Sequence, residues 1–333
     1  MIITRTPFRM SFFGGGTDMP EFFNEHGGSV ISTTFDKYCY VTARHLPPFF
    51  DYSTELAYSK IERVKDPSEL EHPAVRNAMQ MLDMREMRVS YEADLPARSG
   101  LGTSSSFAVG MLNAFHCMKG TYASKERLAK EAIHLERELC AEAGGWQDQV
   151  AAAFGGLNRI DFADDDFTVH PIVISPERKR ELESNLMLFF TGFTRFSSDM
   201  QRKNHVVDKA AQLEEMLALV DVAEGVLTDK RRDLAEFGRL LDTTWKLKRG
   251  TGSQVSTGSI DALYERGINA GALGGKLLGA GGGGFLVFYV EPDAQTSVHN
   301  AMEGLLRIPF RFENDGAVVA YYGPEDYDLK EAR

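Results

Sequence analysis

A loop of small and hydroxyl residues is the stretch of this chain best suited to chemistry. Residues 96–106 read Pro-Ala-Arg-Ser-Gly-Leu-Gly-Thr-Ser-Ser-Ser and run into an apolar segment typical of a helix. Glycine allows tight turns and close approach of a ligand, and Thr or Ser is a preferred helix N-cap. Free N–H groups at a helix start, with the helix dipole behind them, bind anions. The loop therefore predicts a site for nucleotide phosphates, with an ordinary capped helix start as the alternative.

A single carboxylate on an apolar helix face is the second candidate. At about 100° per residue, the apolar residues between 124 and 143 share one arc, and Glu136 projects into its middle. Burying an unpaired carboxylate is costly, so Glu136 should meet a cation, a metal ion or a strong donor. A structural salt bridge at the end of the stripe is the alternative. Because serine hydroxyls and carboxylates are hard oxygen ligands, they suit Mg²⁺.

Asp148 and Arg9 complete the set of charged candidates. Asp148 follows the turn Gly144-Gly145 and opens a predicted short helix. An acidic residue there is stabilised by the helix dipole, while the functional interpretation is a carboxylate presented to a substrate. Arg9 lies on the non-core face of a predicted half-buried strand over 5–13. The following loop, 14–18, suits a polyhydroxylated ligand or is a plain turn.

These groups together fit phosphoryl transfer, which depends on positioning and charge neutralisation more than on covalent chemistry. One carboxylate would support a metal ion, and the other would orient or deprotonate an acceptor hydroxyl. An arginine close to both would stabilise the transferring group. The pattern indicates an ATP-dependent kinase.

A second glycine cluster excludes two other nucleotide-binding classes. Residues 279–284 match GxGxxG literally, but a dinucleotide site needs a helix after the glycines, and 285–290 is a β-type run. The sequence GxxxxGK[ST] is absent, since Lys276 is followed by leucine. We predict instead a strand–glycine loop–strand hairpin whose bare backbone presses against the 96–106 loop or a phosphate.

Composition limits the partners and the compartment. The chain has 333 residues, of which 43% are hydrophobic and 26% charged, and its net charge is −11. This balance argues against a nucleic-acid or anionic-membrane surface. Three scattered cysteines suggest a reducing compartment. Because the N-terminal residues lack an apolar signal core and no run reaches transmembrane length, we expect a cytoplasmic protein.

The elements that must position these groups form an α and β pattern in two domains. We place the boundary at residue 185, which gives domains 1–185 and 186–333. Strands are expected at 29–43, 88–93, 157–162, 186–190 and 316–322. Helices are expected at 73–84, 124–143, 197–227, 229–248, 256–267 and 294–306.

Three motifs in order resemble the GHMP kinase superfamily, which includes galactokinase, homoserine kinase and mevalonate kinase. They are Thr6-Pro-Phe-Arg-Met-Ser-Phe-Phe-Gly-Gly-Gly-Thr-Asp18, the Pro-x3-Gly-Leu-Gly loop at 96–106, and Lys276-Leu-Leu-Gly-Ala-Gly-Gly-Gly283. The resemblance implies an α+β fold. It consists of an N-terminal α/β domain like ribosomal S5 domain 2 and a C-terminal ferredoxin-like domain, with ATP between them.

The resemblance also implies a role for each matching position. Asp148 corresponds to the catalytic base or orienting group, with Arg9 beside it. Ser104 and Glu136 correspond to the Mg²⁺ ligands. The sugar would be bound by Gly16, Thr17, Asp18, Gly145 and Arg195. ATP would be bound by Arg98, Ser99, Gly100, Leu101, Gly102, Thr103, Ser104, Ser105, Gly279, Gly281 and Gly282.

Within the superfamily, the first motif and Trp146-Gln-Asp-Gln149 are similar to kinases of heptose 7-phosphate. That similarity implies transfer of the ATP γ-phosphoryl group to the anomeric hydroxyl, giving a 1,7-bisphosphate for nucleotide-activated heptose synthesis. Two alternatives remain open. One is a fucokinase-like sugar-1-kinase acting on an unphosphorylated sugar, and the other is an inactive sugar-binding regulator. The expected partner is a sugar phosphate, without nucleic acid or membrane, and a homodimer is one option for assembly.

Overall fold

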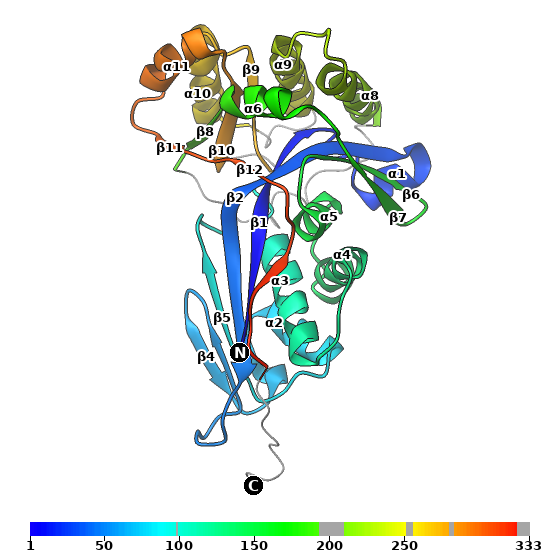
Figure 1. The fold of residues 1–333 in the computed structure, drawn as a ribbon, viewed down its shortest axis with the longest axis vertical. Helices are drawn as coiled ribbons and strands as arrows, with labels where there is room; N and C mark the ends of the chain where they lie inside the picture. The colour runs from blue at the N-terminus through cyan, green and yellow to red at the C-terminus, as the bar shows by residue number, and fades with distance from the viewer. Residues whose placement is uncertain (98, 193–209, 251–255, 280–282, 325–333) are drawn as a thin grey trace.

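The computed structural model describes residues 1–97, 99–192, 210–250, 256–279 and 283–324. The described chain forms two sheets, each with its own helices (Figure 1). The first sheet and its helices fill the lower part of the view, and the second sheet with the later helices lies above. Among these residues, no helix is long and apolar enough to cross a membrane.

The first sheet is built around two long antiparallel strands, β1 (Ile2–Phe13) and β2 (Gly28–His45). Its main path runs β13-β1-β2-β5-β3-β4, and β6, β7 and β12 attach through β2. The remaining strands of this sheet are β3 (Thr54–Ala57), β4 (Ile61–Val64), β5 (Met87–Ala93), β6 (Asn158–Ala163), β7 (Asp166–Pro171), β12 (Phe312–Glu313) and β13 (Val318–Tyr322).

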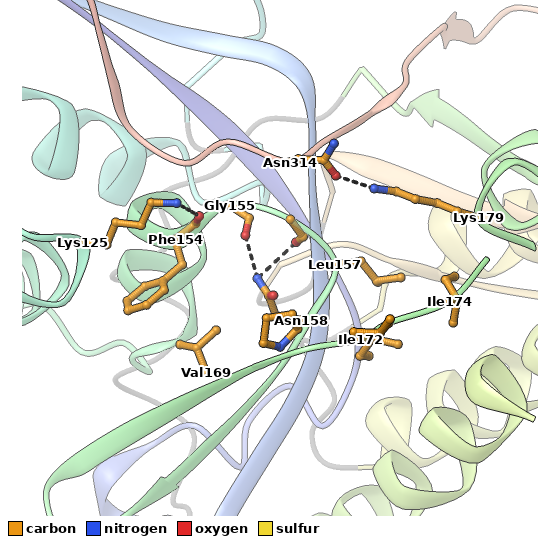
Figure 2. A pocket seen from close by; sticks show the side chains of 13 residues that line it. Lys125, Phe154, Gly155, Leu157, Asn158, Val169, Ile172, Ile174, Lys179 and Asn314 are labelled. Atoms are coloured by element: carbon orange, nitrogen blue, oxygen red, sulfur yellow. Dashed lines mark hydrogen bonds between the residues drawn. The ribbon is translucent and has the colours of Figure 1, made fainter. Parts of the chain in front are cut away.

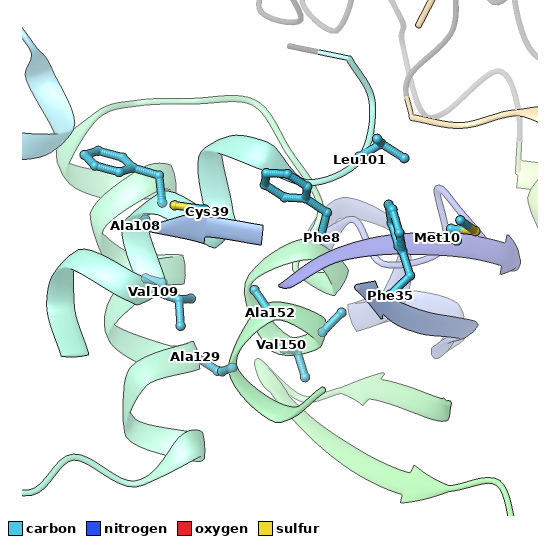
Figure 3. Close-up of a cluster of buried hydrophobic side chains, with 14 of the residues drawn as sticks. Phe8, Met10, Phe35, Cys39, Leu101, Ala108, Val109, Ala129, Val150 and Ala152 are labelled. Carbon is cyan, nitrogen blue, oxygen red and sulfur yellow. The ribbon is translucent and has the colours of Figure 1, made fainter. Parts of the chain in front are cut away.

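Helices pack against one face of this sheet and enclose the main hydrophobic core. Helix α3 lies against β1 and β2, with α4 and α5 behind it (Figure 1). Figure 3 shows part of this core, which includes Phe8 and Phe35 of the sheet and Val109 and Val150 of the helices. The helices of this part are α1 (Pro20–His26), α2 (Pro73–Met81), α3 (Thr103–Met118), α4 (Lys125–Ile133) and α5 (Gln147–Phe154), with short helical turns at Pro67–Glu69 and His134–Leu139. Helix α6 (Pro176–Ser184) follows and lies with the second sheet, where it contacts β8 (Leu186–Phe190) (Figure 1).

The expectation of a half-buried strand over 5–13 is wrong. Every residue of β1 from Thr6 to Phe13 is buried. The reason is that the end of β1 is also buried by residues of the second part. The rings of Phe12 and Phe13 pack against the ring of Phe237, with centroid distances of 5.3 and 5.0 Å. Alternation in the sequence could not reveal a cover contributed by residues more than 200 positions away.

The second sheet is antiparallel, with the order β11-β8-β10-β9. The predicted hairpin is present, because β9 (Gly274–Leu277) and β10 (Phe285–Tyr289) pair directly. A smaller apolar cluster, including Trp245 and Phe288, lies between this sheet and its helices. The other elements are β8 (Leu186–Phe190), α8 (Ala210–Thr228), α9 (Ala235–Gly250), α10 (Gly258–Asn269), a turn at Pro292–Ala294, α11 (Gln295–Ala301) and β11 (Leu306–Ile308).

The chain returns to the first sheet after β11. Strand β12 pairs with β2, and β13 pairs with β1 along its edge. Strand β8 of the second sheet begins at Leu186, next to the expected boundary. The segment 186–333 therefore contributes strands to both sheets.

The helix expected at 124–143 is shorter and less regular than its sequence suggests. Ser124 is the N-cap, and its hydroxyl accepts a hydrogen bond from the backbone N–H of Arg127. The α-helical part ends at Ile133, and a π-helical turn follows over His134–Leu139. Such turns are rare and are frequent at functional sites.

Candidate active site

The loop at 96–106 enters helix α3 through a glycine. Helix α3 begins at Thr103, and its N-cap is Gly102 in the left-handed region, with a φ of 71° and no side-chain cap. The expected Thr or Ser cap is thus wrong, because the hydroxyl residues occupy the first helical turn instead. Gly100 also has a positive φ, of 87°. Two such positions explain why the turn uses glycine, and a helix start without a side-chain cap keeps its N–H groups for an anion.

The second glycine segment lies directly against this loop, as predicted. A Cβ atom on Gly100 would meet the Leu278 carbonyl oxygen at 2.3 Å, and one on Gly279 would meet the Gly100 Cα at 2.4 Å. A Cβ on Gly284 would lie 2.1 Å from the Ser99 carbonyl oxygen. Only backbone fits between the two segments. The expected nucleotide contacts Arg98, Gly281 and Gly282 fall outside the described residues.

Arg9 and Asp148 form a bidentate ion pair beside the loop. The Arg9 Nε and Nη2 atoms donate to the two Asp148 carboxylate oxygens at 2.7 and 2.8 Å, and Nη1 donates to the Gly100 carbonyl at 2.7 Å. The Arg9 side chain is 5% exposed and that of Asp148 is 27% exposed. A planar guanidinium fixes a carboxylate in one orientation. Arg9 thus joins the loop to a carboxylate that solvent, and hence a substrate, can reach.

Glu136 is buried, as its place on the apolar stripe indicated, and it accepts hydrogen bonds from neutral groups. Ser105 Oγ donates to its carboxylate at 2.7 Å, and the Gln149 side-chain amide donates to the same oxygen. Burial raises the pKa of Glu136 to about 7, and the nearby Glu142 and Asp148 add to the effect. Glu136 forms no ion pair within the described part of the chain, so the alternative of a structural salt bridge is not found there.

The structure brings Ser105 to Glu136 and leaves Ser104 on the exposed side of the same helical turn. Both residues lie in the first turn of α3, where side chains at consecutive positions point about 100° apart. The π-helical turn at His134–Leu139 sets the direction of Glu136 on the opposing segment. Sequence periodicity placed Glu136 on the inner face but could not show the π turn or the Gln149 contact.

The loop 14–18 is a compact unit tied to the turn before α5. The Thr17 hydroxyl donates to the carbonyls of Gly14 and Ser29, both at 2.9 Å. The Asp18 carboxylate accepts from the backbone N–H of Gly16 at 2.8 Å. A Cβ on Gly145 would lie 1.9 Å from an Asp18 oxygen.

Asp18 is 3% exposed, and burial is the main cause that raises its pKa. The backbone N–H of Gln147 also donates to its carboxylate, at 3.3 Å. The structure therefore joins Gly16, Asp18 and Gly145 to one another next to Asp148. Arg195, the remaining expected sugar contact, lies outside the described residues.

The donor set fits a hard divalent cation. Glu136 is a buried carboxylate without a cationic partner in the described residues, and hydroxyls of the first turn of α3 lie on the facing segment. Mg²⁺ prefers such oxygens and keeps several water and phosphate ligands. The glycine backbone of the 99–102 loop, where an added side chain would clash, fits a phosphate.

One cavity lies away from this cluster. It has a volume of about 500 Å³ and is lined by residues such as Phe154, Asn158, Ile172 and Lys179 (Figure 2). Phe154 is the last residue of α5, whereas Asp148 lies in its first turn. The cavity therefore opens at the opposite end of α5 from the ion pair.

A two-domain α+β fold with a glycine phosphate loop and an arginine-held aspartate defines a small-molecule kinase. Family models support this class directly. Residues 70–156 match the model for the N-terminal domain of GHMP kinases, and residues 222–307 match the model for their C-terminal domain. The chain belongs to the GHMP kinase family, and the fold expected from the motifs is confirmed.

Relatives of known name place the chain among sugar kinases of that family. It is 29% identical over 320 residues to D-glycero-alpha-D-manno-heptose 7-phosphate kinase of Campylobacter jejuni, covering 91% of this chain and 93% of that protein. It is 26% identical to the L-fucokinase/L-fucose-1-P guanylyltransferase of Bacteroides fragilis, covering 88% of this chain and 35% of that protein.

A solved structure is similar to this chain over nearly its whole length. The crystal structure of a D-glycero-D-manno-heptose 1-phosphate kinase from Bacteroides thetaiotaomicron has a TM-score of 0.77 and 25% sequence identity. The match covers 96% of this chain and 99% of that chain. The similarity extends over both sheets, so the arrangement of the two parts is shared as well as the motifs.

Proposed function

We propose that this protein transfers the γ-phosphoryl group of ATP to the anomeric hydroxyl of D-glycero-D-manno-heptose 7-phosphate, giving the 1,7-bisphosphate and ADP. The observation that carries the proposal is the Arg9–Asp148 ion pair, which lies between the glycine loop and the 14–18 loop. The heptose is proposed from the similarity to the Campylobacter jejuni kinase over nearly the whole chain.

The reaction forms one P–O bond and breaks another. The anomeric oxygen attacks the γ-phosphorus, the bond from that phosphorus to the β,γ-bridging oxygen breaks, and ADP leaves with the electron pair. Asp148 orients the hydroxyl and takes its proton. Arg9 holds Asp148 in place through two hydrogen bonds and lies close enough to the loop to stabilise charge on the transferring group.

The nucleotide is proposed to bind along Ser99–Ser105 and Gly279. Mg²⁺ would be held by Glu136 with a hydroxyl from the first turn of α3, either Ser104 as the motif implies or Ser105 as the hydrogen bond suggests. When bound, the ion neutralises phosphate charge and favours an in-line arrangement. The acceptor is proposed to bind at Gly16, Thr17, Asp18 and Gly145.

An ADP-release assay with a panel of acceptors tests the proposal. We expect turnover with heptose 7-phosphate, and phosphorus NMR of the product should show a second, anomeric phosphate. Free L-fucose is the key comparison, since the similarity to the L-fucokinase of Bacteroides fragilis supports the alternative of an unphosphorylated acceptor. Turnover of fucose without turnover of heptose 7-phosphate would contradict the heptose assignment and leave a sugar-1-kinase. An inactive regulator would turn over neither sugar.

A further inference from the structure

Lys276 is a buried cation that the proposed reaction does not use. It lies on β9 and is 1% exposed. Its ammonium group donates to the Phe12 carbonyl oxygen at 2.8 Å. The bond joins the second sheet to the end of β1, 264 residues earlier in the chain. It is therefore a polar contact between the two parts of the molecule.

Phe12 accepts this bond at a β-bulge. In the β1–β2 ladder Ser11 lies opposite Ser32 and Phe13 opposite Ile31, so the register shifts and Phe12 has no partner across the sheet. A bulge bends a strand and changes the direction in which it continues. Lys276 satisfies the carbonyl of the bulged residue. It thus fixes the point at which β1 turns into the 14–18 loop.

That loop follows the bulge directly and is held together by its own hydrogen bonds. The Thr17 backbone N–H and hydroxyl both bind the Gly14 carbonyl, and the Gly16 N–H binds the Asp18 carboxylate. The loop is also tied to Ser29 of β2 and to the turn before α5, so the end of β1 at Phe12 is one of its anchors. A shift of Phe12 would strain the loop against these other anchors.

The strand that carries Lys276 also touches the nucleotide loop. Two residues further along, Leu278 contacts Gly100 through its carbonyl oxygen, and Gly279 contacts the Gly100 Cα. Two residues of a strand span roughly 7 Å. One short segment therefore contacts both the proposed acceptor loop, through Lys276, and the proposed nucleotide loop, through Leu278 and Gly279.

The burial of Lys276 has no explanation in stability. The charged groups that face it are Lys248 of α9, Arg9 of β1 and Asp18 of the loop, and it forms no ion pair within the described residues. Burial and the two cations lower its pKa well below the usual lysine value. A buried ammonium without an ion-pair partner is costly. An apolar residue would pack at this junction at a lower cost.

We propose that Lys276 is a positioning residue for the acceptor, which fixes the 14–18 loop at a set distance from the 99–102 loop. The inference rests on the proposed function in one respect, that the 14–18 loop binds the acceptor. Lys276 acts through the Phe12 carbonyl and does not touch the reacting atoms. Its loss should weaken use of the acceptor while leaving the nucleotide site intact.

Steady-state kinetics on the full chain test this with Lys276→Met, Lys276→Gln and a matched control, Tyr289→Phe. The control also removes a buried hydrogen bond in the second sheet, between the Asn185 amide and the Tyr289 hydroxyl, away from both loops. We expect both lysine variants to raise the acceptor KM at least about tenfold, because small displacements at a reacting centre have large effects. The KM for ATP should stay within about twofold of the wild-type value, and Tyr289→Phe should change neither.

Hydrogen exchange supplies a readout that needs no turnover. In Lys276→Met, amides of residues 13–18 should exchange faster than in the wild type, while those of 99–103 keep their rates. An unchanged acceptor KM, an equal rise in both KM values, or unchanged exchange at 13–18 would overturn the inference. Wild-type protein that phosphorylates no heptose phosphate would contradict the proposed function alone, since the exchange experiment would still decide the role of Lys276.

Discussion

Asp148 is the residue on which the proposed chemistry depends most directly. The substitution Asp148→Asn keeps the size of the side chain but removes the proton acceptor. We expect kcat to fall at least about 100-fold, with binding of a non-hydrolysable ATP analogue largely kept. Stopped-time ADP assays and a fluorescence titration of the analogue measure the two effects. Asp165→Asn, in an exposed turn at the end of β6, is the control. Unchanged turnover would remove Asp148 from its role.

Glu136 should make the metal-free protein less stable as the pH rises. Its pKa is about 7 in the folded chain and near 4.5 when unfolded, so the folded state binds more protons between these values. Stability then decreases with rising pH across this window. In Glu136→Gln this pH-dependent contribution to the free energy of unfolding is absent.

The measurement for Glu136 is the difference in Tm between pH 5 and pH 8 with a chelator present. We expect Glu136→Gln to gain thermal stability relative to the wild type at pH 8 and little at pH 5. The same variant should lose kinase activity if Glu136 holds the metal ion. A wild-type advantage at pH 8 without metal would contradict the raised pKa.

At the scale of elements, the contact between the two glycine segments should tolerate no side chain. Gly100→Ala places a methyl group 2.3 Å from the Leu278 carbonyl oxygen, so we expect a large rise in the KM for ATP and a lower Tm. Gly120→Ala is the matched control, because Gly120 also has a positive φ, of 65°, but has no atom within 4 Å of the added Cβ. The control separates the strain of the backbone from the steric clash.

Thermal melts and ATP titrations of the two glycine variants give the comparison. Equal losses in both would show that backbone conformation, and not the contact with Leu278, requires glycine at position 100. We expect Gly120→Ala to lower the Tm modestly, since an alanine at positive φ costs about 1 kcal/mol, and to leave the KM for ATP unchanged.

The sequence predicted the individual elements of the site better than the contacts between them. The hairpin at 274–289 and the burial of Glu136 follow from local composition and periodicity, whereas the placing of Arg9 beside Asp148 came from the family resemblance. The β-bulge at Phe12 and the π turn before Leu139 have no local signature, because both depend on what packs against the strand and the helix. The sequence shows that Lys276 is unusual, because this charged residue follows two glycines and precedes an apolar run. It does not show that Lys276 contacts Phe12.

For the whole molecule, the return of the chain to the first sheet has a direct test. A fragment of residues 1–185 lacks β13, which pairs with β1, and the cover that Phe237 gives to Phe12 and Phe13. We expect this fragment to lack a cooperative thermal transition and to bind a hydrophobic dye. Circular dichroism melts and dye fluorescence, with the full chain as reference, measure both. A sharp transition near the Tm of the full chain would contradict the expectation.

The pairing of β1 with β13 also bears on the order in which the protein is made. Strand β1 is synthesised long before Val318–Tyr322, its neighbour in the sheet, since Ile2 pairs with Tyr322. Residues near both ends of the chain meet, since the Met1 ammonium group binds the Gly323 carbonyl. This edge of β1 therefore stays unpaired until β13 has been synthesised, and until then it is exposed to pairing with other nascent chains. The site assembled on that strand is completed only after the hairpin of β9 and β10, far later in the sequence, has been synthesised.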